Sequence, residues 1–261
     1  MRAEDKERAV AEVVARIVAA AGPGAGLDAA IADTIYQERR RYEKERGKSR
    51  DAGLKRWDDR RRVLLAAASP EEKKALLGKI AEEFAREVLG NFDPKVHRFA
   101  TKVLPFALSG LLNALSPTRL VRSFPEMPSV RDRLIVDGMV DEARELKDRG
   151  TVIVCPTHLS NLDSIVLGYA FFDAGFPPLT YGAGLNLFTN RLISYFMHNL
   201  GAYKVDRRKT AQVYKDVLKE YATITLEYGY HNLFFPGGTR CRSGAIESKL
   251  KLCLLACGLR A

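Results

Sequence analysis

The stretch "VIVCPTHLSNLD", from Val152 to Asp163, places a histidine among small polar residues directly after an apolar run. The apolar run predicts a buried strand and the residues after Asp163 predict a helix. His158 is therefore expected at the carboxyl end of a sheet, where α/β proteins place their chemistry. A nearby carboxylate can fix the tautomer of a histidine and stabilise the imidazolium that forms during proton abstraction. His158 and Asp163 could therefore be a general base and the carboxylate that orients it. A structural histidine in a loop fits the same pattern.

The stretch "GAYKVDRR", from Gly201 to Arg208, places cations near the end of a second expected strand. These cations are Lys204, Arg207 and Arg208. Cations at the end of a strand can hold an anion in the crevice along the edge of a sheet. Taken alone, the stretch is equally typical of a solvated basic loop.

The stretch "FFPGGTRCRSG", from Phe234 to Gly244, leads an apolar strand into a turn rich in proline and glycine. In this turn the backbone can approach a ligand closely. The turn residues are Gly237, Gly238 and Thr239. Arg240 and Arg242 follow two positions apart, so in an extended segment their guanidinium groups lie on one side and suit a phosphate. The Gly-Lys-Ser/Thr sequence of a P-loop does not follow.

Taken together and in this order, the three stretches resemble the sequence blocks of the glycerolipid acyltransferase family, the enzymes that acylate glycerol 3-phosphate and its lysophosphatidate product. "HLSNLD" is similar to the family's His-x4-Asp block, "GAYKVDR" to its second block and "FFPGGTRCRSG" to its third. The resemblance covers about residues 150–252. Many members have a glutamate where this chain has Gly237, although the plastid-type branch also lacks it.

The resemblance implies transfer of an acyl group from a thioester to a glycerol hydroxyl in one step. His158 would take the proton from the attacking hydroxyl, and Asp163 would orient His158. The substrate phosphate would be held by basic residues of the second and third blocks, namely Lys204, Arg207, Arg240 and Arg242. The pattern "TRCRSG" is more similar to the branch that acylates glycerol 3-phosphate or dihydroxyacetone phosphate than to the lysophosphatidate branch. The co-substrate would be acyl-CoA or acyl carrier protein, with no other cofactor and no metal.

Cys155 offers a competing nucleophile, because it precedes His158 by three residues. It stands at the end of the apolar strand, and buried cysteines are usually inert. We therefore expect a positioned base, not a thiol, to carry the reaction. The four cysteines form no Cys-x2-Cys pair and have no histidine at zinc-ligand spacing, which indicates free thiols in a reducing compartment.

The pattern of apolar residues changes along the chain. The first ninety or so residues have helical spacing, and "SPEE" at Ser69 predicts a helix start with a capping box. From about Val136, helix and strand patterns alternate. The expected fold is α/β, with an N-terminal helical bundle over residues 1–95 and an acyltransferase domain over residues 96–261 that contains a mixed, largely parallel sheet. The family continues into a fourth block beyond the position of Ala261, so the C-terminal part of the domain is expected to be missing or divergent.

The chain of 261 residues has a formal net charge of +10, which favours an anionic partner such as nucleic acid, a membrane or a phosphorylated substrate. Between Tyr36 and Arg62, twelve Lys and Arg stand against six Asp and Glu, with aromatic residues interleaved. The helical spacing of these acids favours a solvated helix face over a nucleic-acid surface. The start resembles no signal peptide, and the apolar segment from Val103 to Leu115 is typical of a buried or interfacial helix. We expect a cytoplasmic protein bound peripherally to the inner face of the membrane.

Three classes of function fit these observations. The first is an acyltransferase of phospholipid biosynthesis that acts on glycerol 3-phosphate or, as the alternative, on lysophosphatidate. The second is a pseudoenzyme that binds a lipid phosphate without catalysis, which Gly237 and the early C-terminus favour. The third is a nucleic-acid-binding module, but the sequence has no zinc finger, helix-turn-helix or RNA-binding motif. We predict the first, with its acyl donor, its phosphorylated acceptor and a membrane surface as partners, and no nucleic acid.

Overall fold

The computed structural model describes residues 1–261 apart from 23, 104–133, 161–162, 189–190, 239, 242–249, 251 and 253–254, and apart from four further side chains, 186, 187, 192 and 193. Most of the apolar segment from Val103 to Leu115 lies outside the described residues. Thr239 and Arg242 of the third block do so as well.

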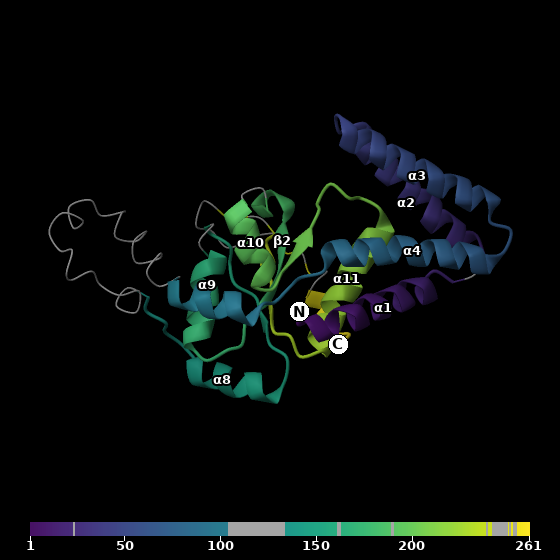
Figure 1. Ribbon diagram of the computed structural model, residues 1–261. Helices are drawn as coiled ribbons and strands as arrows, with labels where there is room; N and C mark the ends of the chain where they lie inside the picture. The colour runs from purple at the N-terminus through teal and green to yellow at the C-terminus, as the bar shows by residue number, and fades with distance from the viewer. Residues whose placement is uncertain are drawn as a thin grey trace.

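Four long helices form the N-terminal part of the chain, as the helical spacing predicts (Figure 1). They are α1 (Ala3–Ala20), α2 (Ala25–Glu43), α3 (Lys48–Ala66) and α4 (Pro70–Val88). The capping box at Ser69 is confirmed, because its side chain accepts a hydrogen bond from the Glu72 N–H and the Glu72 carboxylate accepts one from the Ser69 N–H. Gly47, with φ of 69°, makes the tight turn that lets α3 return alongside α2.

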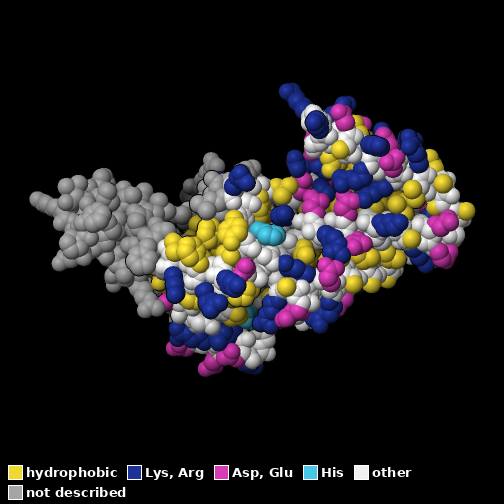
Figure 2. All heavy atoms as spheres, viewed as in Figure 1, with side chains coloured by type: hydrophobic (Ala, Val, Ile, Leu, Met, Phe, Trp, Pro, Cys, Tyr) yellow, Lys and Arg dark blue, Asp and Glu magenta, His cyan; other side chains and the backbone are white. Residues whose placement is uncertain are grey.

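The basic segment from Tyr36 to Arg62 comprises the end of α2 and most of α3. Acidic residues pair with several of its cations, for example Arg39 with Asp58 at 2.8 Å, so part of the segment forms a solvated, ion-paired surface. Figure 2 shows Lys and Arg interspersed with Asp and Glu over these helices. Trp57 does not belong to this surface, because its side chain is fully buried in the core.

Helices and strands alternate in the second part of the chain, as predicted. Its elements are α8 (Val140–Arg149), β1 (Ile153–Val154), α9 (Asp163–Asp173), β2 (Thr180–Gly184), the 3-10 helix η1 (Leu185–Phe188), α10 (Arg191–Asn199), β3 (Ala202–Val205), α11 (Gln212–Glu227), β4 (Asn232–Leu233) and α12 (Leu255–Gly258). The strands form one sheet in the order β1-β4-β2-β3. The α/β prediction is confirmed. All pairings between the described strands are parallel, so the sheet is not mixed in this part of the chain.

The main hydrophobic core joins the N-terminal helices to the sheet through α11. Phe84 of α4 packs edge-on against Tyr214 of α11 with ring centroids 5.4 Å apart, and Tyr203 of β3 packs against Tyr221 of α11 at 5.5 Å. Figure 1 shows α11 beside α1 and α4. One core thus contains residues from both sides of residue 95. The division of the chain into two domains near residue 95 stays a prediction. Among the described helices, none combines the length and the apolar character needed to cross a bilayer.

Candidate active site at the carboxyl edge of the sheet

His158 and Asp163 lie together at the carboxyl end of β1. The imidazole Nδ1 of His158 is 2.8 Å from Oδ2 of Asp163, which is the first residue of α9. The same carboxylate oxygen accepts hydrogen bonds from the backbone N–H groups of Leu159 at 2.7 Å and Ser160 at 2.8 Å. The loop from His158 to Asp163 thus folds back on the start of the helix, and this positions both side chains.

Asp163 is ionised at neutral pH. Its partial burial acts to raise the pKa of the carboxyl group, but the hydrogen bonds from the Ser160 N–H, the His158 ring and the Leu159 N–H outweigh burial and leave the pKa lowered. Facing an ionised carboxylate, Nδ1 of His158 carries the proton and donates it in the hydrogen bond. Nε2 is then the basic nitrogen of the ring. The side chains of His158 and Asp163 are 21% and 19% exposed, so both are accessible from solvent.

Phe235, next to the Pro-Gly-Gly turn, contacts His158, and this contact was not predicted from the sequence. Its ring stacks on the imidazole of His158 with centroids 4.2 Å apart and planes inclined by 29°. The backbone N–H of Cys241 also donates to the carbonyl of His158 at 2.7 Å. Because β1 and β4 are adjacent and parallel, their carboxyl ends meet at one edge, and this brings the first and third blocks together.

Arg207 connects the second block to the third. Its Nη2 donates to the carbonyl of Gly238 at 3.0 Å, although β3 and β4 are separated by β2 in the sheet. Gly238 has a φ of 66°, a left-handed conformation that favours glycine, and its N–H closes the turn onto the carbonyl of Phe235 at 3.0 Å. The turn after β4 therefore lies between the guanidinium of Arg207 and the imidazole of His158.

The other residues of the second and third blocks lie as follows. Arg240 is described and exposed, two residues beyond Gly238, and Gly237 is partly exposed within the turn. Lys204 lies in β3 with its Nζ 5.9 Å from the centroid of the Phe188 ring. Arg208 binds Asp206 through Nε and Nη2 at 3.0 and 2.9 Å. The structure thus joins Arg207, Gly238, His158 and Asp163 in one chain of contacts, and Thr239 and Arg242 lie outside the described residues.

Cys155 is exposed, so the expectation of a buried cysteine was wrong. The strand β1 ends at Val154, and the side chain of Cys155 therefore lies in the loop rather than in the sheet. Desolvation nevertheless raises the pKa of its thiol, which reduces the thiolate fraction at neutral pH. The acidity of the thiol gives no support to a role as nucleophile.

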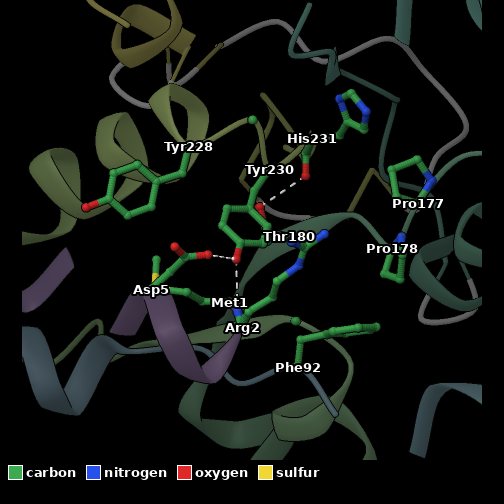
Figure 3. A pocket seen from close by; sticks show the side chains of 12 residues that line it. Met1, Arg2, Asp5, Phe92, Pro177, Pro178, Thr180, Tyr228, Tyr230 and His231 are labelled. Atoms are coloured by element: carbon green, nitrogen blue, oxygen red, sulfur yellow. Dashed lines mark hydrogen bonds between the residues drawn. The ribbon is translucent and has the colours of Figure 1, made fainter. Parts of the chain in front are cut away.

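A separate cavity lies at the opposite, amino end of the strands (Figure 3). Its volume is about 190 Å³, and its walls include Thr180 at the start of β2 and His231 just before β4. The Thr180 N–H donates to the carbonyl of His231 at 2.8 Å, and the His231 Nδ1 accepts from the Val152 N–H at 2.9 Å. These contacts hold strand ends together, so His231 is a structural histidine. The predicted site residues do not line this cavity.

The fold and the site define the class of protein: a parallel α/β domain with a His-Asp pair at the carboxyl edge of its sheet. Residues 139–254 match the family model described as Acyltransferase, and they include β1, the His158 loop, Arg207 and the Pro-Gly-Gly turn. Over these residues the chain is similar to the Acyltransferase family, as the three sequence blocks indicated.

Curated relatives that this chain resembles include three glycerol-3-phosphate acyltransferases. That of Aeromonas hydrophila subsp. hydrophila is 33% identical over 115 residues, which cover 43% of this chain and 14% of the relative. That of Pseudomonas aeruginosa strain LESB58 is 24% identical over 166 residues, covering 63% of this chain and 17% of the relative. That of Xylella fastidiosa strain M23 is 28% identical over 110 residues, covering 41% and 12%. The chain thus matches less than a fifth of the length of these relatives.

Proposed function

We propose that this protein transfers a fatty acyl group from an acyl thioester to the hydroxyl group of glycerol 3-phosphate in phospholipid biosynthesis. The observation that carries the proposal is the 2.8 Å contact between His158 and Asp163 beside the turn that Arg207 contacts. The names of the relatives support glycerol 3-phosphate as the acceptor. Lysophosphatidate, which differs from it by one acyl chain, is the alternative acceptor.

In this proposal His158 is the general base. Asp163 holds the proton on Nδ1, so Nε2 takes the proton of the attacking hydroxyl while the hydroxyl oxygen bonds to the thioester carbonyl carbon. The carbon–sulfur bond then breaks, and the leaving thiolate takes the proton from Nε2 of His158, which returns the imidazole to its neutral form. Asp163 stabilises the transient imidazolium, and the Phe235 ring restricts the plane of the imidazole. Acceptor and base held in contact suffice for the reaction without a covalent acyl-enzyme.

The acceptor phosphate would be held by cations beside this base. Arg207, with its Nη2 on the Gly238 carbonyl, is the nearest along the chain of contacts. Arg240 follows the same turn and is exposed to solvent. Arg242 and Lys204 complete the proposed set on the basis of the sequence blocks. A guanidinium group can bind two phosphate oxygens at once, which orients the hydroxyl toward the base.

The test is an acyl-transfer assay with radiolabelled acyl-CoA and, separately, acyl carrier protein thioesters, each offered to glycerol 3-phosphate and to lysophosphatidate. We expect His158→Ala to lower turnover by about 10²–10⁴-fold, the range for loss of a general base. The exposed substitution Asp148→Asn on α8 serves as the control and keeps full turnover. Fluorescence of Trp57 verifies that each variant retains its core.

Two outcomes would contradict the proposal. Turnover in His158→Ala equal to that of the wild type would remove His158 from the chemistry. Binding of the acceptor without turnover in a folded protein would instead support a pseudoenzyme that binds a lipid phosphate.

We also propose that the protein acts in the cytoplasm at the inner face of the membrane, bound peripherally. Ile165 and Phe172 are seven residues apart on α9, so they lie on one face, and they are 40% and 42% exposed. Figure 2 shows hydrophobic side chains gathered over the α9 and α10 part of the visible face. Together with the net charge of +10, they suit an anionic lipid surface. Flotation with anionic liposomes tests this, and protein that stays at the bottom of the gradient contradicts it.

A further inference from the structure

A basic groove lies between the C-terminal half of α2 and the loop that joins β3 to α11. We call it the α2 groove. Its volume is about 550 Å³, and it is lined by Gln37, Arg40, Arg41, Lys44, Glu45, Arg207, Arg208 and Thr210. Five cations and one carboxylate therefore face the same space. Figure 1 shows the loop between β3 and α11 arching away from the sheet toward the N-terminal helices.

The two walls of the α2 groove are held together by specific contacts. The Thr210 hydroxyl donates to Oε1 of Gln37 at 3.0 Å. The next contact lies deeper, where Nζ of Lys209 is 3.7 Å from the buried carboxylate of Glu38 on α2. Both Lys209 and Glu38 have side chains under 5% exposed, at 4% and 1%. The groove is therefore a fixed feature of the fold, formed by segments far apart in the sequence.

Two of the five cations are engaged by carboxylates and shape the groove. Arg41 lies between Glu38 at 2.8 Å and Glu45 at 3.0 Å. Desolvation acts to lower the pKa of Arg41, but the hydrogen bond and charge of Glu38 outweigh it and raise the pKa. The other engaged cation is Arg208, whose hydrogen bonds to Asp206 raise its pKa.

The other three cations are available for a ligand. Arg40, Lys44 and Arg207 form no ion pair with a carboxylate among the described residues, and all three are exposed. Arg40 lies near Tyr36 of the same helix, with Nη1 3.4 Å from its hydroxyl. Arg207 also contacts the Gly238 turn, so one end of the groove adjoins the proposed active site.

We propose that the α2 groove binds the phosphate groups of the acyl donor, a thioester whose carrier ends in a phosphorylated nucleotide. This inference rests on the proposed acyl transfer. Guanidinium and ammonium groups bind phosphate oxygens through charge-assisted hydrogen bonds. The phosphates of the donor can bind Arg40 and Lys44, while Arg207, at the end of the groove, remains with the acceptor phosphate. The volume lies within the range of about 300–1,000 Å³ typical of ligand pockets. A concave groove of this size suits a small phosphorylated ligand better than the broad surface of a carrier protein.

The test is calorimetric binding of coenzyme A to the full chain, independent of turnover. Arg40→Gln with Lys44→Gln removes two available cations of α2, and neither residue belongs to the proposed catalytic set. We expect this double variant to weaken coenzyme A binding at least tenfold, because each charge-assisted hydrogen bond contributes more than a neutral one. The matched control is Lys55→Gln with Arg61→Gln, which removes the same charge from exposed positions on α3 outside the groove. This control is expected to bind coenzyme A like the wild type.

Further probes separate the sources of phosphate. Dephospho-coenzyme A is expected to bind more weakly than coenzyme A to the wild type and equally to the double variant. The double variant is also tested with glycerol 3-phosphate, with phosphatidate vesicles and with an acyl carrier protein. If it binds one of these more weakly than the wild type does but binds coenzyme A equally well, the proposal is overturned. Displacement of coenzyme A by inorganic phosphate at the same concentration would also overturn it, because the groove would then be an unselective anion site.

Binding in the His158→Ala background separates this proposal from the proposed function. If the His158→Ala protein binds coenzyme A and this binding depends on Arg40 and Lys44, the proposed role of the α2 groove is supported whether or not the wild type transfers acyl groups. If the wild type transfers acyl groups from coenzyme A with a KM that the double variant does not change, the acyl transfer stands and the groove is refuted.

Discussion

At the scale of single residues, the carboxylate of Asp163 links the local fold to the proposed chemistry. Its folded pKa is below the ordinary value of 3.8, so the unfolded chain binds more protons in acid than the folded chain does. The contribution of Asp163 to stability is therefore fully present above pH 3.8 and is lost as the pH falls through the lower, folded pKa.

We predict that Asp163→Asn is less stable than the wild type at pH 7 and that the difference shrinks as the pH is lowered toward 3. The reason is that protonation removes from the wild type the same negative charge that the substitution removes. Urea unfolding of both proteins over this pH range measures the difference. Asp148→Asn, whose side chain is 75% exposed, is the control. A difference between wild type and Asp163→Asn that is constant with pH would contradict the lowered pKa.

The sequence placed His158 and Asp163 close together, but it did not predict the contacts of His158 with distant parts of the chain. His158 and Asp163 are close in the chain, so a helix start after the loop was enough to bring them together. Phe235 could not be assigned to His158, because their contact depends on the pairing of β1 with β4, and the two residues are far apart in sequence. The position of Phe235 beside the Pro-Gly-Gly turn was the available signal.

At the scale of elements, the sequence correctly predicted features whose pattern lies within a few neighbouring residues. The capping box at the start of α4 is such a signal. We predict that Ser69→Ala lowers the free energy of unfolding by about 1 kcal/mol, because the Glu72 N–H loses its acceptor. Ser69→Asp, which keeps an acceptor, is expected to retain most of the stability. Denaturant midpoints measure both, and a Ser69→Ala midpoint equal to the wild type would show that the cap contributes nothing.

Strand β2 was missed because its sequence, "TYGAG", contains two glycines, which are depleted in strands. The structure explains one of them. A Cβ at Gly182 would lie 3.0 Å from the ring of Tyr203 on the neighbouring strand β3, and that ring is buried. The glycine is needed for close packing between strands, which is a tertiary requirement that the local pattern does not reveal.

At the scale of the whole molecule, Lys209 joins the N-terminal helices to the loop that carries Arg207. Its Nζ is 2.6 Å from Oε2 of Glu87 on α4 and 3.7 Å from Oε2 of Glu38 on α2. It also lies 4.3 Å from the centroid of the Phe84 ring, in the core that these helices share with α11. Its partners are far away in sequence, so this contact could not be predicted, and it gives a reason to expect that the two parts of the chain unfold together.

We predict that Lys209→Met lowers the free energy of unfolding by about 2 kcal/mol, because Glu87 loses its partner at 2.6 Å and the buried Glu38 keeps only Arg41. Lys215→Met, at an exposed position of α11, is the matched control and is expected to unfold like the wild type. Fluorescence of Trp57, the single tryptophan, reports the N-terminal helices, and far-ultraviolet circular dichroism reports the whole chain. Because one core spans both parts, the two transitions are expected to coincide and to shift together in Lys209→Met. Separate transitions would instead favour two units divided near residue 95, and an unchanged midpoint would show that Lys209 does not couple them.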